Sequence, residues 1–483
     1  MKLLNIANAL KDKAQLYGNG QAEITALCAD SRRVKPGALF FCIPGLRMDG
    51  HAFAPMAVEA GAAALVVERR LDLDCPQLVV PDVREAIPLA AACFFGYPAR
   101  ELKLIGITGT KGKTTTSYLV KSILEKAGCK VGLIGTVGSV IGETQIPTNL
   151  TTPDPIDFQA LLRQMADAGA DFVVMEVSAH ALALKKLTGV RFEAAAFTNL
   201  SQDHFDFFGG FDNYLAAKMK LFEPDMCARA VYNKDDERVA GAMKQVKIPA
   251  EGYAIRVPAQ IYAKDIDVNE RGCTFQLNFH KRYRLDVTLH LSGIFNVYNS
   301  LTAAALCDEV GVAPECIRDG LEAVKSVPGR IELLDTDTPY RVILDYAHSP
   351  DALENILNTV RQTARARVIA LFGCGGDRDH EKRPIMGEIG GRMADFCVLT
   401  SDNPRSEDPF EILREIEAGI RPTGGEYVVI ENRREAIRYA MNMAEPGDVI
   451  VLAGQGHETY QEITGVKYPF DEKVVLKELL EEI

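Results

Sequence analysis

The chain has 483 residues, which is too long for one hydrophobic core, so we expect two to four domains. Its apolar content of 47% and charged content of 25% are those of an ordinary globular protein. The formal net charge of −12 argues against a general nucleic-acid or membrane-surface binder, but it is compatible with a local basic pocket for an anionic small molecule.

The eleven cysteines are scattered, with no C-x-x-C pair, which is typical of reduced thiols in a cytoplasm. The first residues, MKLLNIANALKDK, lack the apolar segment and cleavage site of a signal peptide. No stretch has the length of a membrane span. These features predict a soluble cytoplasmic protein.

A small α/β domain is expected first. Residues 38–45 and 63–68 are short apolar strand candidates, and residues 86–96 have the pattern of a helix. Polar residues cluster between them, at 30–32 and 49–53. These clusters suit the rim of a ligand site, and they suit turns and helix caps equally well.

Residues 102–116, LKLIGITGTKGKTTT, combine a buried strand, a glycine-rich turn and the start of a helix. In such a turn, backbone N–H groups and the helix dipole face an anion, Lys113 neutralises charge, and Thr114 offers a hydroxyl to Mg²⁺. Ile107 stands where the common phosphate-loop pattern has a glycine. We therefore interpret the stretch as a variant nucleotide-binding loop. An ordinary strand-to-helix turn is the alternative, and the loop alone does not separate an ATP-dependent enzyme from a nucleotide switch.

Strand candidates then alternate with helices, at residues 130–136, 170–177 and 194–200. This alternation predicts a parallel sheet with helices on both faces, whose binding groups lie at the carboxyl ends of the strands. Glu176, Ser178 and Asn199 fall at such ends. Glu176 is a candidate ligand of Mg²⁺, or else a buried strand-end glutamate paired with a lysine. His204 follows near the same edge, where a lone histidine is more often structural.

Lys218 lies in a segment with helical spacing, residues 214–222. By default it is a solvated helix lysine, and its ammonium form is a poor neighbour for Mg²⁺. It suits a metal site only when neutralised or carboxylated.

The last part of the chain changes character twice. Residues 250–292 alternate polar and apolar side chains, which predicts antiparallel strands. A third α/β region starts near residue 331, with strand candidates at 340–345, 368–372, 396–400, 427–430 and 448–453.

Three loops that follow these strands carry unusual polar residues: FGCGGDRD, DNPR and AGQGHE. Together they offer two arginines and two acids toward one cleft. This combination suits a zwitterionic ligand, with arginine for carboxylate and acid for ammonium. A surface salt-bridge network is the alternative.

These motifs together resemble those of the Mur ligases of bacterial peptidoglycan synthesis, over nearly the whole chain. The stretches that carry the resemblance are TGTKGKTTT, TTPDP, MEVSAHAL, FTNLSQDHFDF, YLAAKMKLF, GIFNVYNSLTAAA, VPGRIELL, DYAHSPDAL, FGCGGDRDHEKRP, SDNPRSEDP and AGQGHETYQ. Within the family, D-N-P-R marks members that add meso-diaminopimelate, whereas lysine-adding relatives differ there.

The resemblance implies three α/β domains: a UDP-binding domain over residues 1–98, a P-loop, parallel-sheet ATP-binding domain over 99–330 and a Rossmann-like, amino-acid-binding domain over 331–483. The implied activity is ATP-dependent addition of meso-diaminopimelate to UDP-N-acetylmuramoyl-L-alanyl-D-glutamate through an acyl phosphate. A lysine-adding member, a relative of folylpolyglutamate synthetase and a P-loop switch without ligase chemistry are the alternatives. We expect a monomer that binds neither nucleic acid nor membrane.

The resemblance also implies roles for single residues. ATP would be bound by Gly109, Thr110, Lys111, Gly112, Lys113, Thr114, Thr115, Asn296, Asn299, Arg330, Asp345 and His348. The UDP-muramoyl-dipeptide would contact Ser31, Thr151, Thr152, Ser178 and Lys186. Diaminopimelate would be received by Arg378, Asp402, Asn403, Pro404, Arg405, Gly454 and Glu458. Mg²⁺ would be held by Thr114, Glu176, His204 and Lys218, with catalytic roles for Lys113, Lys218 and His204.

Lys218 matches the family lysine that is carboxylated by CO₂, and the resulting carbamate is an anion with oxygen ligands for Mg²⁺. Two positions depart from the family pattern. Lys111 stands where many relatives have asparagine, and Lys186 stands where many have arginine. At the second position a point charge replaces a bidentate contact.

Overall fold

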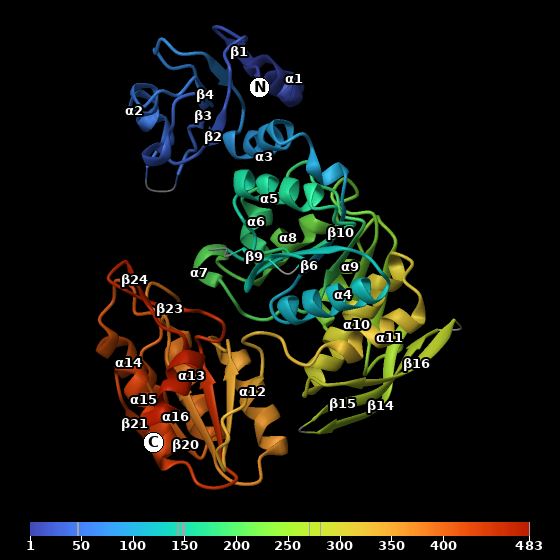
Figure 1. The fold of residues 1–483 in the computed structure, drawn as a ribbon, viewed down its shortest axis with the longest axis vertical. Coiled ribbons are helices and arrows are strands. Elements are labelled where there is room, and N and C mark those ends of the chain that lie inside the picture. The colour runs from blue at the N-terminus through green and yellow to red at the C-terminus, as the bar shows by residue number, and fades with distance from the viewer. Residues whose placement is uncertain (46–47, 143, 147–149, 270, 281, 483) are drawn as a thin grey trace.

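The computed structural model describes residues 1–45, 48–142, 144–146, 150–269, 271–280 and 282–482. Three large sheets follow one another along the chain, and Figure 1 shows them from the N-terminal sheet at the top to the C-terminal sheet at the bottom. We call the three parts of the chain that contain these sheets, with their helices, the first, central and third units. None of the described helices is long and apolar enough to cross a membrane.

The first sheet has five strands in the order β1-β5-β4-β3-β2. The strands are β1 (Gln15–Tyr17), β2 (Ala26–Cys28), β3 (Ala38–Phe41), β4 (Ala64–Val67) and β5 (Gln77–Val79), and the helices are α1 (Leu3–Leu10), α2 (Ala54–Glu59) and α3 (Val83–Phe94). The strands predicted at 38–45 and 63–68 and the helix predicted at 86–96 are confirmed, with shifted ends. Helix α3 packs on α5 (Pro155–Asp167) of the next unit.

The second sheet has eleven strands in the order β16-β15-β14-β13-β12-β11-β6-β10-β7-β8-β9. They are β6 (Lys103–Thr108), β7 (Val131–Gly135), β8 (Gly138–Ile141), β9 (Thr144–Ile146), β10 (Phe172–Glu176), β11 (Ala194–Phe197), β12 (Ala230–Asn233), β13 (Ala250–Ala254), β14 (Ile261–Asn269), β15 (Gly272–Phe279) and β16 (Tyr283–Leu289). The predicted parallel arrangement is confirmed for β7, β10, β6 and β11, and it continues through β12 and β13.

The prediction of antiparallel strands over 250–292 is confirmed for β14, β15 and β16. It is wrong for residues 250–254, which form β13 parallel to β12. Tyr253 and Ala254 are buried there.

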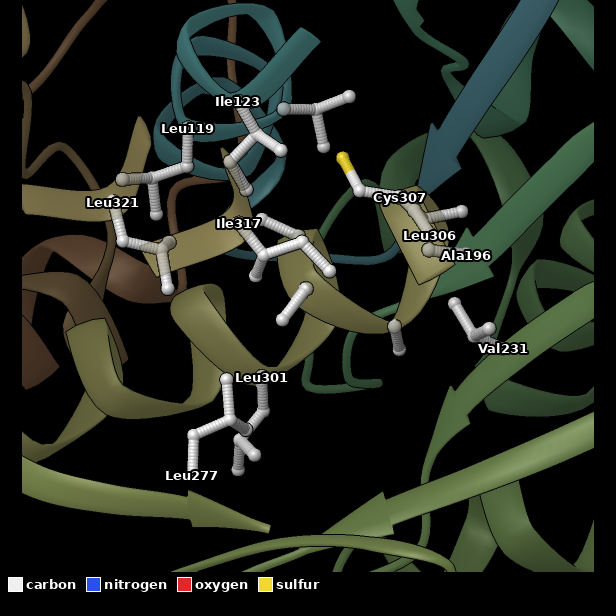
Figure 2. Close-up of a cluster of buried hydrophobic side chains, with 14 of the residues drawn as sticks. Leu119, Ile123, Ala196, Val231, Leu277, Leu301, Leu306, Cys307, Ile317 and Leu321 are labelled. Carbon is white, nitrogen blue, oxygen red and sulfur yellow. The ribbon is translucent and has the colours of Figure 1, made fainter. Parts of the chain in front are cut away.

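Helices cover both faces of the central sheet. They are α4 (Lys113–Lys126), α5, α6 (Ala179–Ala183), α7 (Phe205–Phe208), α8 (Phe211–Met219), α9 (Glu237–Met243), α10 (Ile294–Glu309) and α11 (Pro314–Ala323). On one face α4, α10 and α11 share a core with the strands, in which Ile123, Leu301 and Ile317 are fully buried (Figure 2). Each such side chain contributes about 1.5–3 kcal/mol on burial. This core fixes α4, and with it the phosphate loop, to the sheet.

The third sheet has six strands in the order β17-β18-β22-β19-β20-β21. They are β17 (Glu332–Leu334), β18 (Arg341–Asp345), β19 (Val368–Phe372), β20 (Phe396–Leu399), β21 (Tyr427–Val429) and β22 (Val449–Ala453), and a separate hairpin is formed by β23 (Tyr460–Ile463) and β24 (Val466–Pro469). Its helices are α12 (Pro350–Thr363), α13 (Lys382–Met393), α14 (Pro409–Ile420), α15 (Arg433–Met443) and α16 (Glu472–Glu482). All five strands predicted after residue 331 are confirmed, and β18 to β22 run parallel.

Candidate active site

The phosphate loop joins the end of β6 to the start of α4. Gly109 and Gly112 have positive φ values of 143° and 83°. A Cβ at Gly109 would lie 1.9 Å from Thr198 Oγ1, and one at Gly112 would lie 2.3 Å from Asn299 Oδ1. Ile107, at the position of the missing glycine, is a fully buried residue inside β6. The loop therefore has glycine where the backbone turns and neighbours crowd it, and a core side chain where the strand is still regular.

Two residues after β11 hold this loop in place. Asn199 accepts a hydrogen bond from the Lys111 backbone N–H (2.9 Å) and donates one to the Lys111 carbonyl (3.0 Å). Thr198 donates from its hydroxyl to the same carbonyl at 2.7 Å. Asn199 thus holds the loop through both the oxygen and the nitrogen of its side-chain amide. Thr198 was not predicted as a site residue from the sequence, although a hydroxyl residue directly after a strand is a recognisable signal.

Two lysine side chains meet at one carbonyl of the loop. Lys113 donates from Nζ to the carbonyls of Gly109 (2.9 Å) and Thr110 (2.8 Å). Lys218, on α8, also donates to the Gly109 carbonyl, at 2.9 Å, and its Nζ lies 4.4 Å from the centre of the Tyr214 ring. Lys218 is only 1% exposed, so the solvated-helix interpretation is wrong. Burial, and then the nearby charge of Lys113, lower the pKa of Lys218 well below its ordinary value.

The expected metal ligands present oxygen atoms near the loop. Glu176 ends β10 and is 1% exposed, and its two oxygens accept from the N–H (2.9 Å) and the hydroxyl (3.0 Å) of Thr136 rather than from a lysine. The Thr114 hydroxyl accepts from Arg330 Nη2 at 3.1 Å. A carboxylate and a hydroxyl fit Mg²⁺, which takes few protein ligands beside phosphate and water. Within the described residues, no cluster of three or more His, Cys, Asp or Glu side chains is arranged to hold a metal.

The remaining two metal candidates differ in environment. His204 has a left-handed backbone (φ 56°) and a side chain that is 42% exposed, and its ring lies 4.7 Å from that of His180. Lys218 in its ammonium form does not fit a metal site, because it brings no lone pair and repels the ion. It fits only when it is neutralised or carboxylated.

Residues of the third sheet reach the central unit at several points. Lys111 donates from Nζ to the Ser349 hydroxyl at 2.5 Å, and His457 Nε2 lies 3.1 Å from the Thr136 carbonyl. The backbone N–H of Tyr346 donates to the carbonyl of Gly329 at 2.9 Å. His457 was not singled out from the sequence, because its partner lies 321 residues away.

Burial shapes the titration of this junction. It lowers the pKa of His348 to about 3, with the charges of Lys382 and Lys111 as further causes, and it lowers the pKa of His457 to about 4. Burial raises the pKa of Asp345. Both imidazoles are therefore neutral near pH 7.

The charged loops of the third sheet form the other end of the site. Glu458 accepts from the Tyr346 hydroxyl (3.1 Å) and from Asn403 Nδ2 (2.8 Å), and burial raises its pKa. Asp402 is 7% exposed, and its Oδ1 accepts from the Asn403 backbone N–H at 2.7 Å. Arg405 donates to the Gly376 carbonyl at 2.7 Å. Because Asp402 and Asn403 are buried, a surface salt-bridge network does not describe this arrangement.

Apart from Ser31, the residues expected at the muramoyl-dipeptide lie along the edge of the central sheet. Thr152 donates to the Glu176 carbonyl (2.9 Å) and accepts from the Ser178 N–H (3.0 Å). The Thr151 hydroxyl lies 3.0 Å from that of Thr136. Lys186 Nζ lies 2.7 Å from Asp154 Oδ1. The hydroxyl of Thr152 thus holds the backbone where β10 ends, between Glu176 and Ser178.

A cleft of about 1450 Å³ between the central and C-terminal sheets unites most of these residues. Of the residues expected at ATP, it is lined by Thr110, Lys111, Gly112, Lys113, Thr114, Thr115, Asn296, Asn299, Arg330, Asp345 and His348. It is also lined by Thr151, Thr152, Ser178, Lys186, Glu176, His204, Arg378, Asp402, Asn403, Arg405, Gly454 and Glu458.

Four expected site residues do not line this cleft. Gly109 and Lys218 contact each other just behind the loop. The Pro404 carbonyl faces Gly376, where a Cβ would lie 2.0 Å from it. Ser31 lies on the short helix Ser31–Arg33 beside the first sheet, so the structure does not bring it to the other groups.

Comparisons with known proteins agree with this arrangement. Three family models match the chain: the Mur ligase family catalytic domain over residues 23–103, the Mur ligase middle domain over 107–307 and the Mur ligase glutamate ligase domain over 329–456. A solved structure of a UDP-N-acetylmuramoyl-L-alanyl-D-glutamate–2,6-diaminopimelate ligase superposes with a TM-score of 0.69 at 31% identity, and covers 100% of this chain and 99% of that one. A folylpolyglutamate synthase from Mycobacterium tuberculosis shares the fold at 19% identity and a TM-score of 0.64, over 77% of this chain and 92% of that one.

Full-length relatives are also similar in sequence. The UDP-N-acetylmuramoyl-L-alanyl-D-glutamate–2,6-diaminopimelate ligase of Syntrophomonas wolfei is 43% identical, with 99% of each chain covered. The protein of the same name from Geobacillus thermodenitrificans is 44% identical, with 97% of each chain covered. With family matches in all three units and this identity along the whole sequence, the chain belongs to the Mur ligase family of ATP-dependent ligases.

Proposed function

We propose that this chain is the ATP-dependent ligase that adds meso-diaminopimelate to UDP-N-acetylmuramoyl-L-alanyl-D-glutamate in the assembly of peptidoglycan precursors. The observation that carries the proposal is that one cleft contains both a phosphate loop and a set of paired acidic and basic side chains. The names of the relatives at 43–44% identity support the same reaction.

The first step would take place at the phosphate loop. The side-chain carboxylate of D-glutamate attacks the γ-phosphorus of ATP, an oxygen–phosphorus bond forms, and ADP leaves. Two anions must meet in this step. Lys113 and the N-terminus of α4 lower their mutual repulsion, because they place positive charge where the phosphates lie.

Thr114 and Glu176 are the residues that would hold Mg²⁺ beside the phosphates, and His204 is the proposed contact of a second ion. Bound Mg²⁺ would neutralise phosphate charge. Lys218 would contribute as a carbamate: its amine nitrogen bonds to the carbon of CO₂ and releases a proton to solvent. The enclosed position of Lys218 against the loop supports this role, since a carbamate there would place an anion near the metal.

The second step would join the amino acid. An amine of diaminopimelate attacks the acyl phosphate carbon, a nitrogen–carbon bond forms, phosphate leaves and a proton is lost. Asp402 and Glu458 suit the ammonium groups of this substrate, and Arg378 and Arg405 suit its carboxylates. Closure of the third unit over the loop would exclude water, which otherwise hydrolyses the acyl phosphate.

The division of labour among the units follows the same proposal. Residues 1–98 would bind the UDP part through Ser31 and its neighbours, 99–330 would bind ATP, and 331–483 would bind the amino acid. Thr151, Thr152, Ser178 and Lys186 would contact the muramoyl-dipeptide from the central unit.

Two other functions share parts of this site. A lysine-adding ligase would need no group for the far carboxylate, whereas Arg378 and Arg405 both line the cleft. A folylpolyglutamate synthetase shares the ATP-binding unit, and the D-N-P-R loop counts against it. A charged contact between an arginine and the far carboxylate of diaminopimelate is worth about 1.5–3 kcal/mol, so we expect a clear preference for diaminopimelate over lysine.

The decisive experiment measures phosphate release with ATP, UDP-N-acetylmuramoyl-L-alanyl-D-glutamate and a panel of amino acids, omitting each component in turn. Release that needs all three substrates and is fastest with meso-diaminopimelate is the expected result. Release that ignores the amino acid would contradict the ligase proposal, and equal kcat/KM for L-lysine would contradict the selectivity.

A further inference from the structure

A buried ion pair lies directly behind the proposed amino-acid end of the cleft. Arg433 begins α15, Glu472 begins α16, and both side chains are fully buried. Arg433 Nε donates to Glu472 Oε1 at 2.8 Å. Buried ion pairs are weak contributors to stability, because desolvation offsets their attraction. The location of this pair therefore calls for an explanation other than stability.

The guanidinium of Arg433 connects two loops that carry proposed substrate contacts. Its Nη1 donates to the Ser401 carbonyl at 3.2 Å, and its Nη2 donates to the Ala453 carbonyl at 2.8 Å. The next residues along the chain are Asp402 and Gly454. Strands β20 and β22, which lead into these loops, are separated by β19 in the sheet. One planar fork of donors thus fixes the relative position of two loops that no strand pairing joins.

The carboxylate of Asp402 lies close to this fork without pairing with it. A Cβ built on Gly454 would lie 2.4 Å from Asp402 Oδ2 and 3.9 Å from Arg433 Nη1. Asp402 Oδ2 is buried, and within the described residues it has no hydrogen-bond partner. The donors of Arg433 are directed at Glu472 and the two carbonyls instead.

We propose that Glu472 is a positioning residue for substrate selection: by balancing the charge of Arg433, it leaves the Asp402 carboxylate free to bind an ammonium group of the amino-acid substrate. Without Glu472, Arg433 would be an uncompensated buried cation next to a buried carboxylate. Asp402 would then become its counter-ion and lose its attraction for the substrate. The inference rests on the proposed function, because it assigns Asp402 to the incoming amino acid.

The test is the variant Glu472→Gln, which keeps the shape and a hydrogen-bond acceptor but removes the charge. We expect the KM for meso-diaminopimelate to rise about tenfold or more, because an ion pair with the substrate is lost. The KM values for ATP and the UDP-muramoyl-dipeptide should stay within about twofold. Glu478→Gln is the matched control, since Glu478 lies on the same helix and pairs with the partly exposed Arg434 at the surface.

A double-mutant cycle shows whether the effect passes through Asp402. In an Asp402→Asn background, Glu472→Gln should raise the KM for the amino acid no further, because the carboxylate it protects is gone. Glu472→Asp keeps the charge and should stay within about threefold of wild type. Additive effects in the cycle, an unchanged amino-acid KM, equal rises in all three KM values or an unfolded Glu472→Gln protein would each overturn the inference.

A failure of the proposed function itself can be told apart from a failure of the inference about Glu472. A wild-type protein that does not require an amino acid for phosphate release refutes the function before any variant is compared. If the wild type uses another amino acid, the cycle is run with that substrate, and the role of Glu472 is judged on its KM.

Discussion

Lys111 of the phosphate loop donates a 2.5 Å hydrogen bond to the hydroxyl of Ser349, the residue that precedes helix α12 of the third unit. Both backbone groups of Lys111 are held by Asn199, so this lysine is fixed at its base and engaged at its tip. Burial lowers the pKa of its ammonium group. The loop that would bind phosphate is thus mechanically linked to the unit that would bring the amino acid.

We predict that Ser349→Ala weakens the docking of the third unit on the central one. A hydrogen bond from a charged donor is worth about 1.5–3 kcal/mol, so local opening should become about tenfold more frequent. Hydrogen–deuterium exchange checks this at Tyr346, whose backbone N–H donates to the Gly329 carbonyl across the boundary between the two units. Ser122→Ala, which removes a hydroxyl bonded to Gly320 within the central unit, should leave that exchange unchanged. Equal exchange in both variants would show that the contact contributes nothing to docking.

The parallel strands could be predicted because burial on both faces makes them continuous apolar runs. Residues 368–372 form β19 with the predicted bounds, and all five are buried. The hairpin β23–β24 was missed, since its residues are exposed or half-buried and follow no apolar pattern. The sequence signal for a strand is a burial signal, and it fails where a strand is not buried.

The candidate site likewise contains some residues that could be predicted from the sequence and others that could not. Lys113, Thr114 and the charged loops are predictable, because the chemistry of these groups is local and its spacing is readable in the chain. Arg433 and His457 were not found, since their roles arise from partners 20 to 321 residues distant. The contacts of Arg433 exist only once the third unit is folded, and that of His457 only once the units are docked, so no local pattern encodes them.

We predict that Lys218→Ala is nearly inactive and is partly rescued by a small added carboxylate such as acetate. The substitution removes a buried side chain that contacts the Gly109 carbonyl, and a small anion can occupy the space and restore negative charge there. Phosphate-release assays with and without acetate measure the effect. Lys220→Ala, two residues further on at an exposed position, should retain activity without rescue. Full activity of Lys218→Ala would contradict a catalytic role.

We predict that Asp236→Asn raises the KM for ATP by about threefold to tenfold. Asp236 accepts from the Leu200 N–H at 2.7 Å and caps α9 through the Val239 N–H at 3.0 Å. Leu200 follows Asn199, which holds the phosphate loop, so an asparagine that satisfies only one of the two donors loosens that grip.

Asp408→Asn is the matched control for this change, because Asp408 caps α14 at an exposed position away from the loop. Steady-state kinetics with saturating amino acid and dipeptide give the KM for ATP in both variants. An unchanged KM in Asp236→Asn would show that the loop keeps its shape without this carboxylate.

The last prediction concerns acid. Burial lowers the pKa of His457 to about 4, against 6.5 for a free imidazole, and its neutral ring donates from Nε2 to the Thr136 carbonyl. Between about pH 6.5 and pH 4 the unfolded chain therefore binds a proton at this histidine that the folded protein does not. The free energy of unfolding should fall as the pH is lowered through this window, and should be insensitive to this group above it.

Glutamine at position 457 can donate the same hydrogen bond but has no charge to gain. We expect His457→Gln to flatten the loss of thermal stability between pH 6.5 and pH 4, whereas His290→Gln, at an exposed site, should leave the profile as it is. Because the junction of the second and third units contains the affected contact, the wild-type loss should appear first in the melting of that junction. A pH profile that is identical in wild type and His457→Gln would show that this imidazole titrates normally in the folded protein.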